Sequence, residues 1–161
     1  MDSTETLITK FYTAFQNKNF RIMQECYSPD AVFSDSVFQN LNSREVKAMW
    51  HMLSIGAKDL ELTFDSVKCT DMKGSCIWTA SYTFSLTKRK VINVIQAEFE
   101  FKAEKILIHR DRFNFYRWAR QAFGITGILL GWSPYMRKKV RSASRKRLED
   151  FISQHKEYTN A

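Results

Sequence analysis

The stretch from Ser75 to Phe115, SCIWTASYTFSLTKRKVINVIQAEFEFKAEKILIHRDRFNF, decides the fold. Apolar and polar residues alternate along it, and two short charged segments, KRK and AEK, separate three runs of about ten residues. Alternation with a period of two is typical of strands that bury one face. The stretch therefore predicts three long strands joined by tight turns, in an antiparallel meander.

The alternation also predicts which side chains face the core. The first two runs place these residues inward: Trp78, Ala80, Tyr82, Phe84, Leu86, Val91, Asn93, Ile95, Ala97, Phe99 and Phe101. The preceding segment LELTFDSVKCT, at 60–70, predicts a fourth strand. It turns at DMKG, where Gly74 is expected to adopt a positive φ.

Helical patterns flank the strands on both sides. Helices are predicted from Ser3, over 20–27, from an Asn42–Glu45 capping box to Gly56, over 116–123, and from Pro134 onward. A short strand, DAVFSD at 30–35, lies between the second and third helices. Helices before and after a central meander predict an α+β fold, with helices on one face of a curved sheet.

Length and composition limit the classes of protein. The 161 residues fit one domain, and a hydrophobic content of 44% with 13 Phe can fill a core. The N-terminus lacks a basic region followed by an apolar run, and the uncharged stretch 121–136 is too short to span a membrane. We therefore expect a soluble, cytoplasmic protein. Its three cysteines, Cys26, Cys69 and Cys76, show no metal spacing and are expected to be free thiols.

The net charge of +8 is concentrated near the C-terminus. Residues 137–147, RKKVRSASRKR, contain seven Lys or Arg and no acid, so the remainder carries 8 − 7 = +1. The simpler interpretation is a basic helix face exposed to solvent, and the more specific one is a face that binds an anionic surface. The apolar segment 122–132 directly precedes it, which makes contact with a membrane surface conceivable. No aromatic-rich motif accompanies the charges, so nucleic acid is not expected as a partner.

His109 and Asp111 are the first candidate site residues. Two positions apart on a strand, they share a face and lie ~6.5–7 Å apart. Phe113 continues that face, whereas Arg110 and Arg112 fall on the opposite one. The apolar residues at 106 and 108 leave the assignment ambiguous, but two solvated arginines favour His109 and Asp111 facing a pocket. The pair could orient a water or bind a ligand carbonyl, or it could only tie the strand to a helix.

Asp35 is the third candidate, because alternation in the short strand aims its side chain inward with Ala31 and Phe33. A lone buried carboxyl has a raised pKa and can act as a base near neutral pH. The alternative is that Asp35 caps the following turn. The aromatic residues Trp50, Trp78 and Tyr82 either fill the core or line a cavity, and the sequence does not separate these possibilities.

Two segments resemble the nuclear transport factor 2-like superfamily, in particular its SnoaL-like and ketosteroid isomerase-like proteins. They are KFYTAFQNKNFRIMQECYSPDAVFSD at 10–35 and HRDRFNFYRWARQAFGITGILLGWSPYMRKKVRSASRKRLEDF at 109–151. The resemblance implies a cone-shaped curved antiparallel sheet wrapped around the N-terminal helices, an apolar cavity and an extra C-terminal amphipathic helix. By resemblance, Asp35 matches the general base of the isomerases, and Asp111 matches an acid on the last strand.

The sequence departs from the isomerases at both oxyanion donors. Phe11 stands where they have a tyrosine, although Tyr12 is adjacent, and Ala97 stands where they have a protonated aspartate. Each such donor contributes ~3–4 kcal/mol of barrier stabilisation, so steroid-type isomerisation is not expected.

The sequence thus predicts a single SnoaL-like domain over 1–161, with a core cone at 1–120 and an apolar linker and basic helix at 121–161. We expect it to bind a small hydrophobic molecule in a pocket formed by Tyr12, Phe33, Trp50, Trp78, Tyr82 and Phe113. Asp35, His109 and Asp111 would supply acid/base chemistry without a metal or other cofactor. The chain is also expected to form a homodimer. The alternative function is a non-catalytic homodimeric or protein-interaction module with a filled cavity. An open cavity that reaches both Asp35 and Asp111 would favour the first interpretation.

Overall fold

The computed structural model describes residues 3–56 and 58–159 and contains one six-stranded curved sheet with the strand order β2-β1-β6-β5-β4-β3. Its strands are β1 (Tyr27–Ser34), β2 (Leu41–Asn42), β3 (Glu61–Cys69), β4 (Lys73–Thr83), β5 (Lys90–Lys102) and β6 (Lys105–Arg112). Strands β3 to β6 form the predicted antiparallel meander, whereas β1 pairs in parallel with β6. The α+β fold class predicted from the sequence is confirmed.

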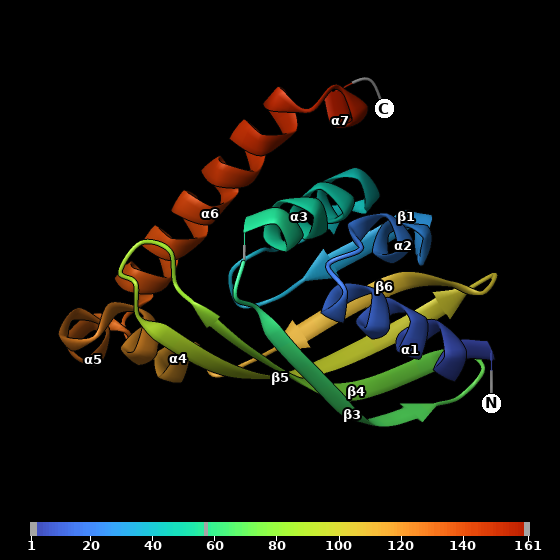
Figure 1. Ribbon diagram of the computed structural model, residues 1–161, viewed down its shortest axis with the longest axis horizontal. Coiled ribbons are helices and arrows are strands. Elements are labelled where there is room, and N and C mark those ends of the chain that lie inside the picture. Colours follow the sequence, from blue (N-terminus) through green and yellow to red (C-terminus); the bar gives the residue numbers. More distant parts are fainter. Residues whose placement is uncertain (1–2, 57, 160–161) are drawn as a thin grey trace.

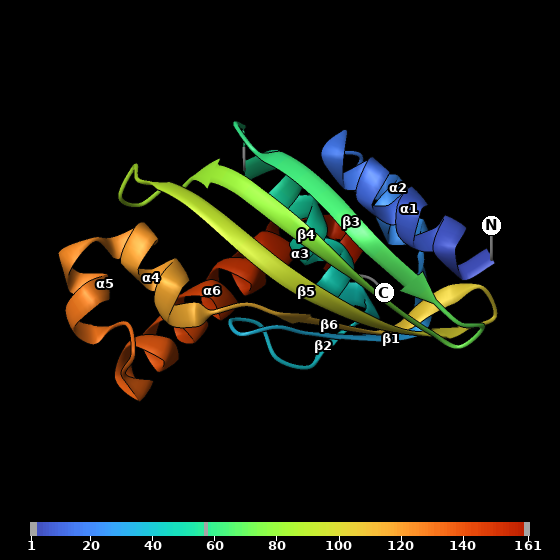
Figure 2. The ribbon, with the colours of Figure 1, turned by 90° about the horizontal axis from the view of Figure 1, so that it is seen from below.

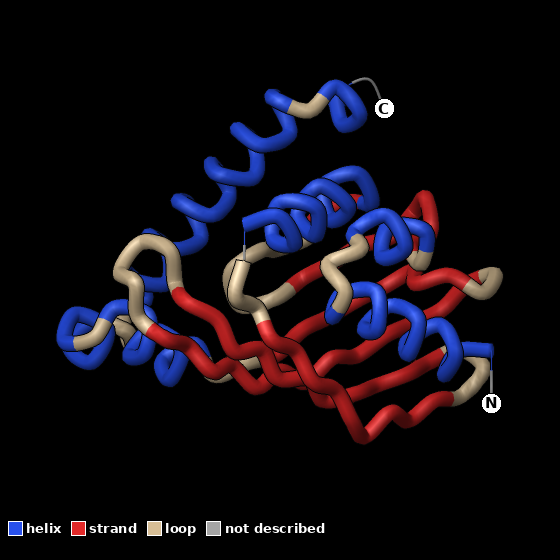
Figure 3. Tube along the Cα trace, viewed as in Figure 1, coloured by secondary structure: helices blue, strands red, loops and turns tan. Residues whose placement is uncertain are grey.

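The helices divide into an N-terminal and a C-terminal group. The first contains α1 (Ser3–Gln16), α2 (Phe20–Glu25) and α3 (Ser43–Gly56), and the second contains α4 (Phe115–Phe123), α5 (Ile125–Leu130), α6 (Pro134–Gln154) and α7 (Lys156–Thr159). Figure 1 shows α1 to α3 on one face of the sheet, with α4 and α5 projecting at one end. From there α6 runs back past α3 to α7 (Figure 3). The view from below shows the sheet curving around the helices (Figure 2).

Helix starts follow the capping signals in the sequence. The amide of Asn42 donates to the Glu45 carboxylate, and the amide of Glu45 donates to the Asn42 side chain, both over 3.0 Å. This is the predicted capping box of α3. At the start of α6, the Ser133 hydroxyl accepts from the amide of Met136 over 3.2 Å, and Pro134 takes the first helical position.

A bulge in β6 resolves the ambiguous alternation around His109. Phe101 pairs with Ile106 and Glu100 pairs with Ile108, so one extra residue of β6 lies between the two pairs. The inward face therefore changes phase, and both Ile106 and His109 are fully buried. Arg110 and Arg112 point outward and pair with glutamates of β5.

Three local predictions were wrong. Gly74 belongs to β4 and has no positive φ. A Cβ atom at this position would lie 2.8 Å from Ile8 Cδ1. Glycine is therefore needed here because α1 approaches the sheet closely. Leu86 is 75% exposed, because β4 ends at Thr83 and leaves it in the following turn. The segment 122–132, expected to be a link, contains the helix α5.

Two hydrophobic clusters form the core. The larger lies between the sheet and the N-terminal helices, and the smaller packs α4 and the start of α6 against β5 around Val91, Trp118 and Met136. Partly buried side chains such as Tyr82 and Phe113 contact both clusters. No helix within residues 3–56 and 58–159 is long and apolar enough to cross a membrane.

Candidate functional site

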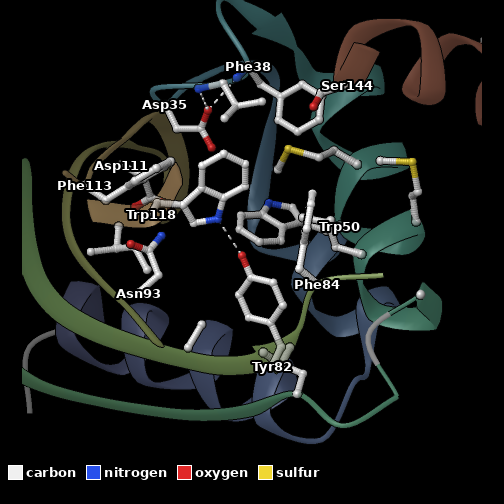
Figure 4. Close-up of a pocket in the computed structure, with 18 of the residues that line it drawn as sticks. Asp35, Phe38, Trp50, Tyr82, Phe84, Asn93, Asp111, Phe113, Trp118 and Ser144 are labelled. Carbon is white, nitrogen blue, oxygen red and sulfur yellow. Dashed lines mark hydrogen bonds between the residues drawn. The ribbon is translucent and has the colours of Figure 1, made fainter. Parts of the chain in front are cut away.

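A cavity of about 250 Å³ lies where the two hydrophobic clusters meet. Its walls come from the inner face of the sheet, from α3, and from α4 and α6 of the C-terminal group. Most lining side chains are aromatic or aliphatic. Both Asp35 and Asp111 line this cavity, together with Phe33, Trp50, Trp78, Tyr82 and Phe113 (Figure 4).

Asp35 follows the last residue of β1 and divides its two carboxyl oxygens between two roles. Oδ1 accepts from the amides of Val37 and Phe38 over 2.7 and 2.5 Å, which holds the turn that follows β1. The other oxygen points away from this turn, into the cavity (Figure 4). The turn-capping alternative is therefore present in the structure, and it uses only one of the two oxygens.

Burial raises the pKa of Asp35 from 3.8 to about 7. The hydrogen bonds from Phe38 and Val37 oppose this change because they stabilise the carboxylate, and the negative charge of Asp111 adds to it. The positive charge of Arg141 on α6 lowers the pKa slightly. Near neutral pH, Asp35 is thus present in both its protonated and its ionised form.

Asp111 is buried on β6 and accepts two hydrogen bonds at the same oxygen. Trp78 Nε1 donates to Oδ1 over 3.3 Å, and His109 Nε2 lies 3.1 Å from the same atom. No hydrogen bond to Oδ2 is formed by any residue in 3–56 or 58–159. That oxygen is therefore available to a molecule in the cavity.

His109 continues this hydrogen-bonded chain away from the cavity. Its Nδ1 lies 2.6 Å from the Tyr27 hydroxyl, which accepts from Trp50 Nε1 over 2.9 Å. Because indole N–H groups only donate, the Tyr27 hydroxyl proton is free to point at Nδ1. Nε2 then carries the proton that His109 donates to Asp111. This tautomer satisfies every member of the chain at once.

The structure brings together Asp35 and Asp111, whereas His109 and Tyr12 lie behind the cavity wall. His109 is completely buried, and it reaches the cavity only through Asp111. Tyr12 is also completely buried, and its ring stacks on Phe64 with a centroid distance of 5.3 Å. The other five predicted pocket residues all line the cavity.

Two further polar features of the cavity were not assigned from the sequence. Trp118 of α4 donates from Nε1 to the Tyr82 hydroxyl over 2.9 Å, and within residues 3–56 and 58–159 that hydroxyl has no acceptor for its own proton. The side-chain amide of Asn93 lines the cavity without a hydrogen-bond partner in the same residues (Figure 4). The inward position of Asn93 in an otherwise apolar row was a usable signal, whereas nothing in the sequence placed Trp118.

The C-terminal helix α6 contributes Ser144 and Arg147 to the lining. Arg141 Nε donates to the carbonyl of Ser36 over 3.0 Å, and Arg145 pairs with Glu45 of α3 over 2.5 Å. These contacts hold α6 against the N-terminal part of the fold. Helix α6 thus forms part of the cavity wall, although it lies far along the chain from β1 and α3, which form other parts.

A curved sheet with an apolar cavity that contains a few polar groups defines the class of nuclear transport factor 2-like folds. Within that class, the family model for the SnoaL-like domain matches residues 8–109. The chain belongs to the SnoaL-like domain family. No curated protein matches the chain in sequence.

Solved structures support the same fold. An NTF2-like protein of unknown function from Burkholderia pseudomallei aligns with a TM-score of 0.66 at 11% identity, covering 77% of this chain and all of that chain. An LEH-like epoxide hydrolase from M. tuberculosis gives 0.62 at 18% identity, covering 80% and 91%. IdmH from Streptomyces antibioticus, a candidate polyketide cyclase, gives 0.62 at 16% identity, covering 73% and 96%. At these identities the likeness establishes the fold.

Between residues 3 and 159, leaving aside residue 57, no group of three or more His, Cys, Asp or Glu side chains is arranged to hold a metal ion.

Proposed function

We propose that the chain binds a small hydrophobic molecule in this cavity and transfers a proton to or from it, or adds water to it. One observation carries the proposal: two carboxyl groups, Asp35 and Asp111, line a single, mainly apolar cavity. Ligand pockets usually combine apolar walls with a few polar groups that fix orientation, and their volumes begin at about 300 Å³. The cavity of about 250 Å³ therefore suits a compact ligand.

Asp35 is the proposed proton carrier. With a pKa of about 7, it takes up and releases a proton with little free-energy change near neutral pH. Its turn-bound Oδ1 fixes the carboxyl group, so the cavity-facing oxygen is already oriented towards a substrate. In a proton transfer, this oxygen would remove a proton from a carbon next to a carbonyl group and return it to another position of the same molecule.

Asp111 is the proposed orienting group, and His109 acts on it from behind. Trp78 and His109 occupy Oδ1, so Oδ2 would bind a ligand hydroxyl or the water that is to be added. In the water addition, Asp35 would accept the proton that leaves the water as its oxygen bonds to one carbon of a carbon–carbon double bond conjugated to a carbonyl. The electron pair of the broken π bond would move to the neighbouring carbon, and Asp35 would return the proton there. The Tyr27 contact fixes the imidazole, which makes His109 a positioning residue in this scheme.

Tyr82 would take over the role of the oxyanion donors that the isomerases have and this chain lacks. Trp118 donates to its oxygen, which polarises the hydroxyl and leaves its proton free for a ligand carbonyl. The Asn93 amide offers a second donor and an acceptor. Tyr82 lies on β4, whereas Phe11 lies on α1 and Ala97 on β5. Asn93 shares β5 with Ala97 but lies four positions before it, so the position of the bound carbonyl would differ from that in the isomerases.

The alternative, an interaction module with a filled cavity, is disfavoured because open volume reaches both carboxyl groups. Homodimerisation remains compatible with either function. The outer face of the sheet exposes Ile77, Ile92 and Val94, which is the surface that we propose for a second copy. Sedimentation equilibrium of the wild-type chain and of Val94→Lys tests this: a dimer that the substitution does not weaken would exclude this face.

Mass spectrometry of small molecules that copurify with the native chain tests the binding proposal. Ala80 lines the cavity, so Ala80→Phe should fill it and remove the copurifying molecule. Thr79, the neighbouring residue on the opposite face of β4, provides the matched control Thr79→Phe. A folded Ala80→Phe variant that retains the same molecule would exclude the cavity as its binding site.

A further inference from the structure

Helix α5 buries its glycine and exposes its large apolar side chains, whereas an ordinary surface helix buries its large apolar side chains. Gly127 is buried against α4, and a Cβ atom there would lie 2.0 Å from the carbonyl oxygen of Ala119. A Cβ at Gly131 would lie 3.1 Å from the ring of Tyr116. The face of α5 with the smallest side chains is therefore turned inward, where the backbones of α4 and α5 meet.

The large apolar side chains of this segment are consequently turned outward. We call the exposed large hydrophobic residues of 125–135 the α5 knob: Ile125, Ile128, Leu129, Leu130, Trp132 and Tyr135. Leu129 is 64% exposed and Trp132 is 68% exposed. Single exposed apolar residues are ordinary, but a contiguous group of this kind marks an interaction site.

Basic residues surround the α5 knob. Arg137, Lys138 and Lys139 are exposed in the first turns of α6, and Arg120 precedes α5 at the end of α4. The chain has no Asp or Glu at all between Asp111 and Glu149. Positive charge at the start of a helix is unfavourable for the helix dipole. Arg137 lies over the Phe115 ring and Lys139 over the Tyr135 ring, whereas Lys138 has no such contact within residues 3–56 and 58–159.

We propose that the α5 knob docks on an anionic phospholipid bilayer. The apolar side chains would enter the interface between headgroups and acyl chains, and the surrounding Lys and Arg would pair with lipid phosphates. Trp132 and Tyr135 are of the residue types that concentrate at this depth of a membrane. A second copy of the chain fits less well, because a symmetric contact through the knob would bring two basic surfaces together.

The shape of the molecule suits contact with a flat surface. Figures 1 and 2 show α5 projecting at one end, away from the sheet and from α7. Arg147 of the cavity lining lies twelve positions after Tyr135, about 18 Å along α6, so the docked cavity would remain outside the acyl layer.

Cosedimentation with lipid vesicles tests the proposal on the full chain. The wild-type protein should bind phosphatidylcholine vesicles that contain phosphatidylglycerol, and should not bind pure phosphatidylcholine vesicles. Binding should disappear between about 0.01 M and about 1 M salt, over which the Debye length falls from ~30 Å to ~3 Å. Vesicle binding does not depend on turnover or on the cavity, so its outcome is independent of the proposed function.

Two pairs of variants assign the surface. Leu129→Gln should lower the partition coefficient at least ~10-fold, since the side chain would lose its burial in the interface. Met72→Gln is its control, because Met72 is 70% exposed in the turn between β3 and β4, at the other end of the molecule. Lys138→Glu should lower binding at least ~5-fold, whereas Lys102→Glu, with the same change in net charge, should not.

Three results would overturn the proposal. The first is no binding to anionic vesicles at the lowest salt concentration. The second is binding that the control substitutions weaken as much as Leu129→Gln and Lys138→Glu do. The third is a concentration-dependent dimer that Leu129→Gln dissociates in the absence of vesicle binding, which would assign the α5 knob to a second copy.

Discussion

The cavity buries polar side chains, whereas the α5 knob exposes large apolar ones. In the cavity, carboxyl and amide groups are enclosed by aromatic side chains. In the α5 knob, large apolar side chains are exposed among basic ones. The cavity combines positions from 15 to 147, whereas the knob is formed by 125–135 alone.

The difference shows how each unfavourable placement is held. Each cavity carboxyl uses one oxygen for hydrogen bonds within the fold, and the other accepts none from residues 3–56 and 58–159. The α5 knob is held by backbone packing through Gly127. Substitutions in the cavity should therefore act through individual polar atoms, and those in the knob should act through burial of area.

The largest expected effect is the pH dependence contributed by Asp35. Its folded-state pKa of about 7 lies above the unfolded value of 3.8, so the folded protein binds the proton more tightly. This contribution to stability is fully present below pH ~4 and is lost as the pH rises through about 7, by about 4 kcal/mol at most. Urea unfolding of the wild type and of Asp35→Asn at several pH values measures it.

The Asp35→Asn variant should lack this decline between pH ~4 and ~7, because an amide does not titrate. Asp59→Asn is the control, since hydrogen bonds and the charge of Lys90 lower the pKa of Asp59, and its contribution therefore changes below pH ~4. A wild-type decline that persists unchanged in Asp35→Asn would show that another group causes it.

Next in size is the loss of turnover in Asp111→Asn. The amide oxygen can still accept from Trp78 and His109, so the fold should be retained. Loss of the positioned carboxyl oxygen should lower turnover of the copurifying ligand by ~100-fold or more. Initial rates, with circular dichroism to verify folding, measure the change; an unchanged rate would remove Asp111 from the mechanism.

Most of the fold could be predicted from the sequence because strand alternation and capping are local signals. The meander and the Asn42–Glu45 capping box are examples. The parallel pairing of β1 with β6 joins segments some eighty residues apart, and no local pattern encodes it. The role of Gly74 was misjudged because its cause, the approach of Ile8, is a contact between distant residues.

The candidate site was predictable to the level of strand faces. Alternation placed Asp35, His109 and Asp111 on inward faces, but it could not place His109 one layer behind Asp111. That depth depends on Tyr27, which supplies the partner of Nδ1 from a different strand. Trp118 was not predictable as a lining residue, because its position depends on how α4 packs against β5.

Tyr27→Phe should destabilise the protein by about 2–3 kcal/mol. The substitution leaves Trp50 Nε1 without an acceptor and His109 Nδ1 without a donor, in a region with no access to water. Tyr82→Phe removes one acceptor, from Trp118, beside an open cavity, so about 1 kcal/mol is expected. Urea unfolding measures both effects. Equal effects of the two substitutions would contradict the claim that Tyr27 links Trp50 and His109 in a buried hydrogen-bonded chain.

Gly127→Ala should destabilise the protein by about 1–2 kcal/mol, because the new methyl group would force α5 away from α4. Gly56→Ala is the matched control at the end of α3, where a Cβ would lie 3.4 Å from the end of the Arg147 side chain. That substitution should be neutral or slightly stabilising. A neutral Gly127→Ala would show that α5 is not held by close packing, and it would weaken the reason for a rigid knob.

The smallest expected effect is on the free energy of unfolding, and it distinguishes an exposed leucine of the α5 knob from a buried leucine of the core. Leu129→Gln should change the free energy of unfolding by no more than about 0.5 kcal/mol, since Leu129 is 64% exposed and glutamine has a similar helix propensity. Leu148→Gln, the same substitution at a completely buried position of α6, should destabilise by about 3 kcal/mol. Urea unfolding without lipid measures both. A clear destabilisation by Leu129→Gln would mean that its side chain is buried within the folded chain or in an oligomer, and the knob would not be free to dock.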